Sequence, residues 1–325
     1  MTLTVLNPLN ILLWFFRRQE QDVANFYRLV TPYVEFATGT NTLNFGFWNE
    51  EKIKDLVQAQ KNLCTVTGRF AELDSATKVI DVGSGFSDPA IEWSSRYQFI
   101  DNILCVDINS HGLRKAKKNI SKYLGRQKEN SDLNLKGENR NVKAISIVNA
   151  TATNLPIPDK FVDRIVALES AQHFKPFSQF VEESYRILKD NGLLVLAIPV
   201  VTLNGKKHTE NIFANSLRDL RNLGVLSLTW ASEHYELSHI RSTILKENFK
   251  LKDLEFIGPS VYGPLADYYF ENRKVFQKRF MEKYRSYSQK IIYNLVEKIV
   301  YRSALSMKHL SEKGIIDYVL IKAER

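Results

Sequence analysis

Two glycines follow directly on a short apolar run, and this pairing constrains the fold more than any other feature of the chain. The run, residues 79–82, fits a strand that is buried on both faces. Gly83 and Gly85 lack a Cβ, so the backbone can turn sharply there and approach a ligand closely. Asp107 ends the next apolar run, about 20 residues on, where its carboxylate can accept hydrogen bonds from both hydroxyls of a ribose. The sequence therefore predicts a nucleoside site at the ends of two neighbouring parallel strands.

The residues after the glycines favour one kind of nucleoside ligand over another. A dinucleotide fingerprint places a third glycine at position 88, beside a helix N-terminus that receives pyrophosphate. This chain has Asp88 there, and we expect Ser87 and Asp88 to cap a helix that begins near Pro89. A carboxylate at that helix end repels pyrophosphate, whereas S-adenosylmethionine has no phosphate and carries cationic sulfonium and ammonium groups. Asp88 thus favours S-adenosylmethionine as the cofactor and disfavours a nicotinamide oxidoreductase.

Two later segments resemble those of a known family. Residues 149–163 are similar to the third and fourth motifs of class I S-adenosylmethionine-dependent methyltransferases. Glu169–Phe174 resembles the tip of strand four in their small-molecule branch, which includes sugar, sterol, quinone and fatty-acyl methyltransferases. The resemblance is close over residues 75–201, and it implies a Rossmann-like α/β fold, a seven-stranded sheet with helices on both faces and an antiparallel last strand. The cofactor contacts that it implies are Asp81, Gly83, Gly85, Asp107, Ile108, Thr151, Ala152 and Glu169.

Two residues depart from the family pattern. Ser87 replaces the third glycine of the loop, and Thr151 stands where an acidic residue usually meets the adenine amino group. A hydroxyl can still accept that hydrogen bond, although more weakly than a carboxylate. These departures bear on the affinity for the cofactor more than on its identity, and they keep a non-catalytic binding module open as an alternative.

Composition excludes several classes of protein. The 325 residues, 44% of them hydrophobic, are enough for a sizeable core in one large domain or two modest ones. Cys64 and Cys105 are the only cysteines, which argues against a disulfide framework and for a reducing compartment. The apolar run 11–16 is too short to span a bilayer and has its arginines after it, so we expect no secretory signal and a cytoplasmic location.

The net charge of +9 leaves three interpretations open. Lysines and arginines are spread over residues 114–128 and 273–308, and solvated basic helix faces are the simplest explanation. Contact with an anionic substrate or a membrane surface comes next, and RNA binding last. Methyltransferases that act on the exocyclic amines of bases carry an Asn-Pro-Pro-Tyr type tetrapeptide after strand four, and this chain has Glu169–Gln172 there. A nucleic-acid partner is therefore not favoured.

Apolar runs alternate with amphipathic stretches, as in a parallel sheet covered by helices. Gly192 is expected to take the left-handed conformation that ends a helix before the fifth strand, and residues 125–141 to form an exposed polar loop. The strands are expected at 79–82, 103–107, 144–148, 163–168, 193–199, 251–257 and 315–322, and helices near 89–97, 111–123, 178–189 and 234–248.

Three segments are additional to the core. We expect residues 1–70 to form an N-terminal helical cap on a core at 71–325, with insertions at 202–233 and 263–313. The last insertion carries apolar residues at steps of three and four, which predicts a single helix with one continuous stripe. That helix could pack onto the body or onto a second subunit, as in a homodimer, or it could be a lid over an apolar substrate. The stripe consists of Phe276, Phe280, Tyr284, Tyr287, Ile291, Leu295 and Ile299.

Methyl transfer requires a base only where the acceptor must lose a proton. His173 lies four residues beyond the tip of strand four, where the resemblance places the sulfonium, and similar sugar O-methyltransferases use a histidine in this loop as the base. A polar structural role is the alternative. Glu169 is expected to position the cofactor or a neighbouring side chain rather than to act as the base.

Aromatic residues are the candidates for binding the substrate. The stretch from Asn25 to Trp48 resembles an aromatic segment of the small-molecule branch, in which such side chains shape an apolar pocket or anchor the segment to the core. The histidines at 208, 234 and 239 have no spacing with Cys or Asp that suggests a metal site, so no metal is expected. The candidate substrate-binding residues are Tyr27, Phe45, Trp48 and Phe280.

These observations together favour one function and leave rivals. The leading hypothesis is an enzyme that moves a methyl group from S-adenosylmethionine to an oxygen or carbon of a small, apolar-bodied molecule. An RNA or protein methyltransferase that docks through its basic helices is the first alternative, and a non-catalytic S-adenosylmethionine-binding module is the second. The acceptor itself is not specified by these motifs, because substrate choice resides in the additional segments.

Overall fold

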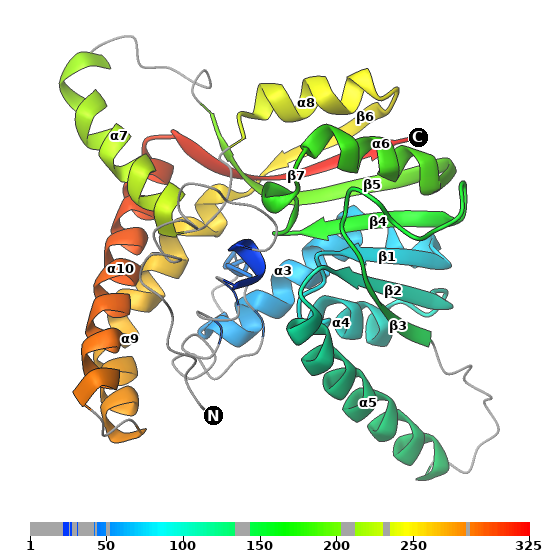
Figure 1. Cartoon of the computed structure of the whole chain (residues 1–325), viewed down its shortest axis with the longest axis horizontal. Helices are drawn as coiled ribbons and strands as arrows, with labels where there is room; N and C mark the ends of the chain where they lie inside the picture. The colour runs from blue at the N-terminus through cyan, green and yellow to red at the C-terminus, as the bar shows by residue number, and fades with distance from the viewer. Residues whose placement is uncertain are drawn as a thin grey trace.

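A seven-stranded mixed sheet forms the centre of the molecule, which we describe from a computed structural model (Figure 1). The structure describes residues 22–25, 27, 31, 42, 44–49, 53–133, 144–202, 212–229, 235–283 and 287–325. The strand order is β3-β2-β1-β4-β5-β7-β6, and β7 runs antiparallel to both of its neighbours. The predicted sheet and its antiparallel last strand are thereby confirmed. The strands are β1 (Lys78–Val82), β2 (Asn102–Asp107), β3 (Ala144–Asn149), β4 (Val162–Leu168), β5 (Leu188–Val201), β6 (Lys250–Phe256) and β7 (Ile316–Glu324).

Helices cover both faces of the sheet. Helices α3 (Leu56–Phe70) and α4 (Asp88–Arg96) cover one face, and α6 (Phe177–Ile187) and α8 (Leu237–Lys246) cover the other. Neighbouring residues of a strand therefore point into different cores, because side chains alternate along a strand. The core under α3 and α4 includes Leu63, Trp93, Val79 and Ile103. The core under α6 and α8 includes Phe180, Ile240, Ile80 and Ile165.

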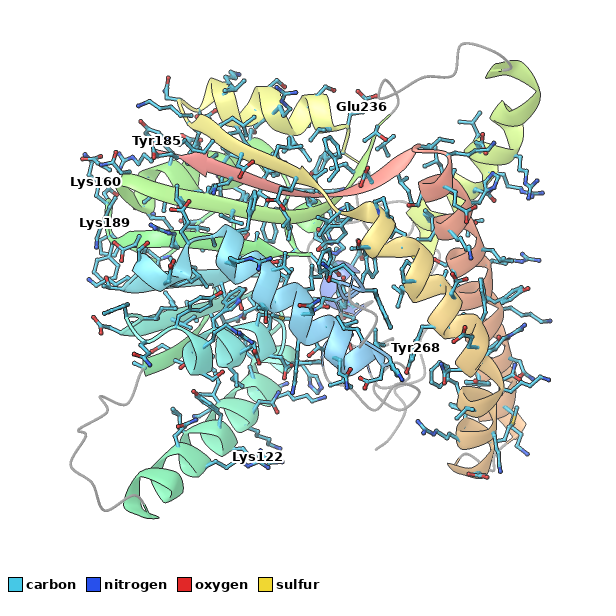
Figure 2. All side chains as sticks on the ribbon, turned by 180° about the vertical axis from the view of Figure 1, so that it is seen from behind. Lys122, Lys160, Tyr185, Lys189, Glu236 and Tyr268 are labelled. Atoms are coloured by element: carbon cyan, nitrogen blue, oxygen red, sulfur yellow. The ribbon has the colours of Figure 1, made fainter. Side chains whose placement is uncertain are left out.

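Helix α5 (Ser110–Leu133) is longer than predicted. It follows β2, packs against β2 and β3, and continues nine residues into the segment that the sequence suggested was a loop. Arg126 and Gln127 are exposed and favour helix, so a polar composition there fits a solvated helix as well as a loop. Figure 2 shows Lys122 on the part of α5 that extends beyond the sheet.

Two turns differ in detail from the prediction. The left-handed residue before the apolar part of β5 is Asn191, with φ 62°, and not Gly192. At the start of α4, Asp88 is already the first helical residue, and Ser87 alone is the cap. Ser87 has φ 62° and makes no side-chain hydrogen bond to the helix, so backbone contacts hold this turn: its N–H donates to the Ser84 carbonyl at 2.8 Å. Asparagine tolerates the left-handed region better than most residues, which explains why Asn191 takes it.

The insertion after β6 contains two helices, so the prediction of a single helix was wrong. Helices α9 (Tyr262–Lys283) and α10 (Tyr287–Glu312) lie side by side, and α7 (Ile212–Thr229), from the insertion after β5, packs against α10 (Figure 1). The rings of Phe280 and Tyr293 stack between α9 and α10 with centroids 3.8 Å apart. Phe280, a member of the predicted stripe, thus packs one helix against the other. Tyr284 lies outside the described residues.

No helix in the described part of the chain is long and apolar enough to cross a membrane.

Candidate functional site

A cavity of about 230 Å³ lies at the carboxyl ends of β1, β2 and β4. The strand order reverses at β1, which lies between β2 and β4. In open α/β sheets, ligands bind beyond the carboxyl ends of the strands at such a point. Residues from the N-terminal segment, including Val23 and Thr31, close its other side. Of the site residues predicted from the sequence, the cavity is lined by Gly83, Gly85, Asp107, Ile108, Ala152, Glu169, His173 and Tyr27.

The carboxylate of Asp107 is held by two backbone amides. Its Oδ2 accepts a hydrogen bond from the Gly85 N–H at 2.8 Å, and its Oδ1 accepts one from the Asn109 N–H at 2.7 Å. Burial raises the pKa of Asp107, and these two amides act in the opposite direction. Each carboxylate oxygen has a further lone pair, so the side chain is oriented and can still accept from a ligand.

The two loop glycines have different reasons to be glycine. Gly83 has φ 74°, and a Cβ there would come within 2.3 Å of the Cβ of Ser170, so the tip of β4 packs directly on the loop. Gly85 has φ 55°, and a Cβ there would meet nothing within 4 Å. Gly85 also lines the cavity, so its missing side chain leaves open space beside the Asp107 carboxylate.

Two more carboxyl groups lie close to the loop. Asp88 lines the cavity at the start of α4, and burial raises its pKa to about 6. Asp81 lies in β1 beneath the cavity and does not line it. Burial, and secondarily the charge of Asp107, raise the pKa of Asp81 to about 8. Its Oδ2 is buried and has no hydrogen-bond partner among the described residues. The site is therefore rich in carboxyl groups that a bound cation would stabilise in the charged form.

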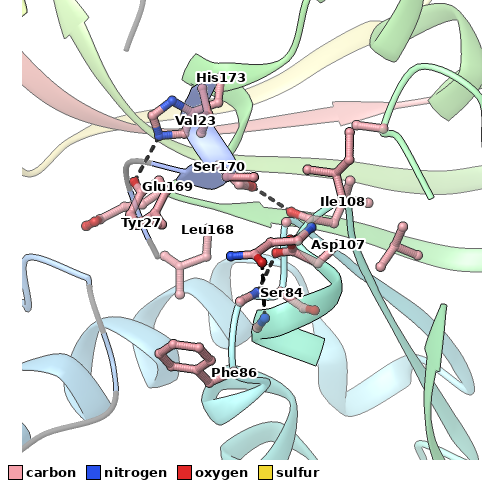
Figure 3. A pocket seen from close by; sticks show the side chains of 18 of the residues that line it. Val23, Tyr27, Ser84, Phe86, Asp107, Ile108, Leu168, Glu169, Ser170 and His173 are labelled. Carbon is pink, nitrogen blue, oxygen red and sulfur yellow. Dashed lines mark hydrogen bonds between the residues drawn. The ribbon is translucent and has the colours of Figure 1, made fainter. Parts of the chain in front are cut away.

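Glu169 and His173 lie at the tip of β4, across the cavity from Asp107 (Figure 3). Glu169 has φ 52°, and its Oε1 accepts a hydrogen bond from the Phe45 N–H at 2.9 Å. Burial raises the pKa of Glu169 to about 8. His173 ends a short 3-10 helix, Ala171–His173, and its Nε2 lies 3.0 Å from the hydroxyl of Tyr27. Burial, with the nearby charges of Glu169 and Asp107, raises the pKa of Tyr27, so its hydroxyl stays protonated.

Five predicted site residues do not line the cavity. Asp81 lies beneath it, and the Thr151 hydroxyl lies 3.0 Å from that of Thr153. Phe45 and Trp48 pack against other parts of the chain. Phe45 packs its ring against Tyr262 and Tyr318, and the indole N–H of Trp48 donates to the Phe45 carbonyl at 3.1 Å while its ring contacts Tyr268 of α9, labelled in Figure 2.

Phe280 is the furthest of the five from the predicted role. It is 2% exposed and stacked on Tyr293 between α9 and α10. No described residue of either helix lines the cavity. The geometry gives no support to a direct substrate contact for Phe280, because its ring is already covered by the neighbouring helix.

Several lining residues were missed by the sequence analysis. Lys115 of α5 lies with its ammonium 4.4 Å from the centroid of the Phe86 ring, and burial lowers its pKa. Phe86 could have been predicted as a lining residue because it directly follows Gly85 of the glycine loop. The first turn of α5 could have been predicted because it follows Asp107. Val23 and Thr42 had no such signal, because they lie far in the sequence from the strand ends that form the rest of the cavity. No group of three or more His, Cys, Asp or Glu residues that could hold a metal ion occurs among the described residues.

A family model described as a methyltransferase domain matches residues 80–196 of the chain. That range runs from β1, through the glycine loop and the tip of β4, into β5. Residues 80–196 therefore form a methyltransferase domain. A solved structure, the mycolic acid cyclopropane synthase CmaA1 complexed with SAH and CTAB, is similar to it over 94% of this chain and 98% of that one, with a TM-score of 0.71 and 15% sequence identity. At that identity the likeness shows the methyltransferase fold.

Two relatives that the chain resembles are named as methyltransferases of small molecules. It is 25% identical to erythromycin 3''-O-methyltransferase of Saccharopolyspora erythraea, over 52% of this chain and 50% of the relative. It is 23% identical to sterol 24-C-methyltransferase of Pneumocystis carinii, over 52% of this chain and 39% of the relative. The match thus spans half or less of the length of these two methyltransferases.

Proposed function

We propose that this methyltransferase transfers a methyl group from S-adenosylmethionine to an oxygen or carbon of a small, apolar-bodied molecule. The observation that carries the proposal is the pairing, across one cavity, of a carboxylate held by the Gly85 and Asn109 amides with the Tyr27 and His173 side chains. The first can hold a ribose, and the second can hold or move a proton beside the acceptor.

The residues present fit S-adenosylmethionine. The space beside Gly85 lets a ligand approach the backbone of the loop closely. The carboxylate oxygens of Asp107 retain lone pairs that can accept hydrogen bonds from ligand hydroxyls. Asp88 occupies the helix start at which a pyrophosphate would need a bare N-terminus. The buried carboxyl groups of Asp81 and Glu169 favour a cationic ligand over an anionic one.

The chemistry supplied by bound S-adenosylmethionine is an electrophilic methyl group on sulfur. The protein contributes orientation, exclusion of water and a route for one proton. In the neutral tautomer of His173 that carries its proton on Nδ1, Nε2 accepts a hydrogen bond from the Tyr27 hydroxyl. The oxygen of Tyr27 can then accept a proton from an acceptor hydroxyl while its own proton moves to His173. An acceptor carbon that loses a proton can use the same route.

The nature of the acceptor is supported by the wall and by the relatives. Val23, Leu168 and Phe174 give the cavity apolar sides. One relative is named as an O-methyltransferase of erythromycin and another as a C-methyltransferase of sterols. The CmaA1 structure is a complex with SAH and CTAB. These support an acceptor with an apolar body and a reactive oxygen or carbon.

The domain organisation belongs to the same proposal. Residues 1–70 would cap the core at 71–325, and their described part supplies Tyr27, Thr42 and Asn44 to the cavity. The insertions at 202–233 and 263–313 would support that cap, since Tyr268 of α9 contacts Trp48. Contact with a membrane surface, self-association as a homodimer and a cytoplasmic location stay predictions.

The test is methyl transfer from isotopically labelled S-adenosylmethionine to panels of acceptors. We expect label in hydroxylated or unsaturated apolar compounds such as macrolides, sterols and prenylated quinols. Total RNA and unfolded protein are the controls for the alternative function. Label that enters only RNA or protein, with rates that fall steeply as salt increases, would replace the small-molecule proposal with docking through the basic helices.

A further inference from the structure

Glu169 is held in a conformation that an ordinary glutamate avoids. It is the first residue after β4, and its φ of 52° lies in the left-handed region. Three hydrogen bonds fasten it there: its N–H donates to the Ala197 carbonyl at 2.8 Å, its carbonyl accepts from Gln172 Nε2 at 2.7 Å, and its carboxyl accepts from the Phe45 N–H at 2.9 Å. Strained residues held on several sides are concentrated at functional sites.

The surroundings of the Glu169 carboxyl contain no described counter-charge. None of the ion pairs among the described residues includes Glu169. The basic side chains of the described residues that line the same cavity are His111, Lys115 and His173. The ionisable groups that interact with Glu169 electrostatically are Tyr27, Cys64, Tyr262 and Tyr318.

The order of the strands separates Glu169 from the nucleoside end of the cavity. Asp107 ends β2, Gly83 and Gly85 follow β1, and Glu169 follows β4, with β1 between the other two strands. Figure 3 shows Asp107 and Glu169 on opposite sides of the cavity. A ligand whose ribose is held by Asp107 must therefore extend over the glycine loop to bring its other end to Glu169.

We propose that Glu169 recognises the positive charge on the sulfur of the methyl donor and thereby distinguishes S-adenosylmethionine from S-adenosylhomocysteine, its uncharged-sulfur product. This inference rests on the proposed function and goes beyond it. The two ligands share ribose, adenine, ammonium and carboxylate groups, so a carboxylate that forms no ion pair with another described residue can separate them only through the sulfonium. Loss of that charge on methyl transfer removes the partner of Glu169 and favours release of the product.

The consequence is a proton count that differs between the two ligands. Burial raises the pKa of Glu169 to about 8, so its carboxyl holds a proton in the free protein at pH 6.5. A sulfonium partner lowers that pKa again and expels the proton, whereas a thioether does not. Free α-amino groups have a pKa near 8, so both ligands enter with a protonated ammonium at this pH.

The experiment is calorimetric titration of the whole chain with each ligand at pH 6.5, in buffers of different ionisation enthalpy. The wild-type protein is expected to release about one more proton with S-adenosylmethionine than with S-adenosylhomocysteine. Equal release with the two ligands would overturn the inference, because the carboxyl would then face a group that both share. That comparison needs no variant.

Glu169→Gln and Glu255→Gln complete the test. Glutamine keeps an oxygen that can accept the Phe45 N–H, so Glu169→Gln is expected to abolish the difference in proton release and to lower the preference for S-adenosylmethionine about tenfold. Glu255 is exposed on β6, and its variant removes the same charge away from the cavity without either effect. A difference that persists in Glu169→Gln would assign the recognition to another group. Failure of both ligands to bind wild-type protein would instead overturn the proposed function.

Discussion

The hydroxyl of Tyr27 lies 3.0 Å from Nε2 of His173, although 146 residues separate them in the chain. Tyr27 belongs to the N-terminal helical segment, and His173 belongs to the 3-10 helix after β4. Their rings meet edge to face, with centroids 5.5 Å apart. The contact joins the N-terminal segment to the end of β4 at the wall of the cavity, so both parts of the chain build that wall.

His173→Ala is expected to lower turnover about 10²–10⁴-fold, because the acceptor proton loses its destination. Tyr27→Phe keeps the ring and removes the hydroxyl, and we expect a loss of about tenfold from it. Wild-type turnover should rise with pH, since the base must be unprotonated. Initial rates on an acceptor from the labelling screen measure these effects, and the affinity for S-adenosylhomocysteine is the control. Full activity of His173→Ala would leave the histidine with a structural role only.

Asp107→Ala is expected to weaken the binding of S-adenosylhomocysteine by about 1.5–3 kcal/mol, which is typical for the loss of charge-assisted hydrogen bonds. The variant also leaves the Gly85 and Asn109 amides without their acceptor. Asp190→Ala removes an exposed carboxylate that pairs with Lys160 and serves as the control. Calorimetry and a thermal melt of each variant distinguish lost affinity from lost folding. An unchanged affinity in a folded Asp107→Ala protein would show that the ribose is held elsewhere.

The stability of the ligand-free protein should fall as pH rises from about 5 to 8. The pKa of Asp81 is about 8 in the folded chain, against about 3.9 for an unfolded aspartate. Over this window the unfolded state has lost the proton that the folded state keeps, so rising pH favours unfolding. Glu169, with a pKa also raised to about 8, acts in the same direction. Asp81→Asn should reduce this dependence in urea unfolding at several pH values. An identical slope for wild type and variant would mean that Asp81 is charged in the folded protein.

Phe280→Ala should destabilise the pair of helices α9 and α10 by about 3 kcal/mol or more, as large-to-small changes in packed sites do. Phe280 is stacked on Tyr293, and the pair is also joined by an ion pair of Arg273 with Glu297. Amide exchange in α9 and α10 should therefore accelerate, while the affinity for S-adenosylhomocysteine stays within about twofold. A selective rise in KM with unchanged exchange would indicate that Phe280 contacts the acceptor after all.

The sheet and the glycine loop could be predicted because their signals are local. Residues 79–82 and 103–107 are largely buried and are apolar except for Asp81 and Asp107, and glycines occupy the turn at Gly83 and Gly85. Asp107 could be placed for the same reason, since it ends a strand whose neighbour carries the loop.

The supporting elements could not be predicted in the same way. A stripe at steps of three and four looks the same whether one helix carries it or two helices share it across a turn, so the contact of Phe280 with Tyr293 was not foreseen. Phe45 and Trp48 were expected in the pocket because they are aromatic, but their rings pack against Tyr262, Tyr318 and Tyr268. Contacts between distant segments leave no period in the sequence.

The most direct test of the central claim is calorimetric titration of the whole chain with S-adenosylhomocysteine and with NAD. The account predicts binding of S-adenosylhomocysteine in the micromolar range, about 8 kcal/mol, and no measurable binding of NAD. The reason is that Asp107 offers its carboxylate to a ribose while Asp88 occupies the helix start that a pyrophosphate requires. NAD binding that is tighter than that of S-adenosylhomocysteine would contradict the account.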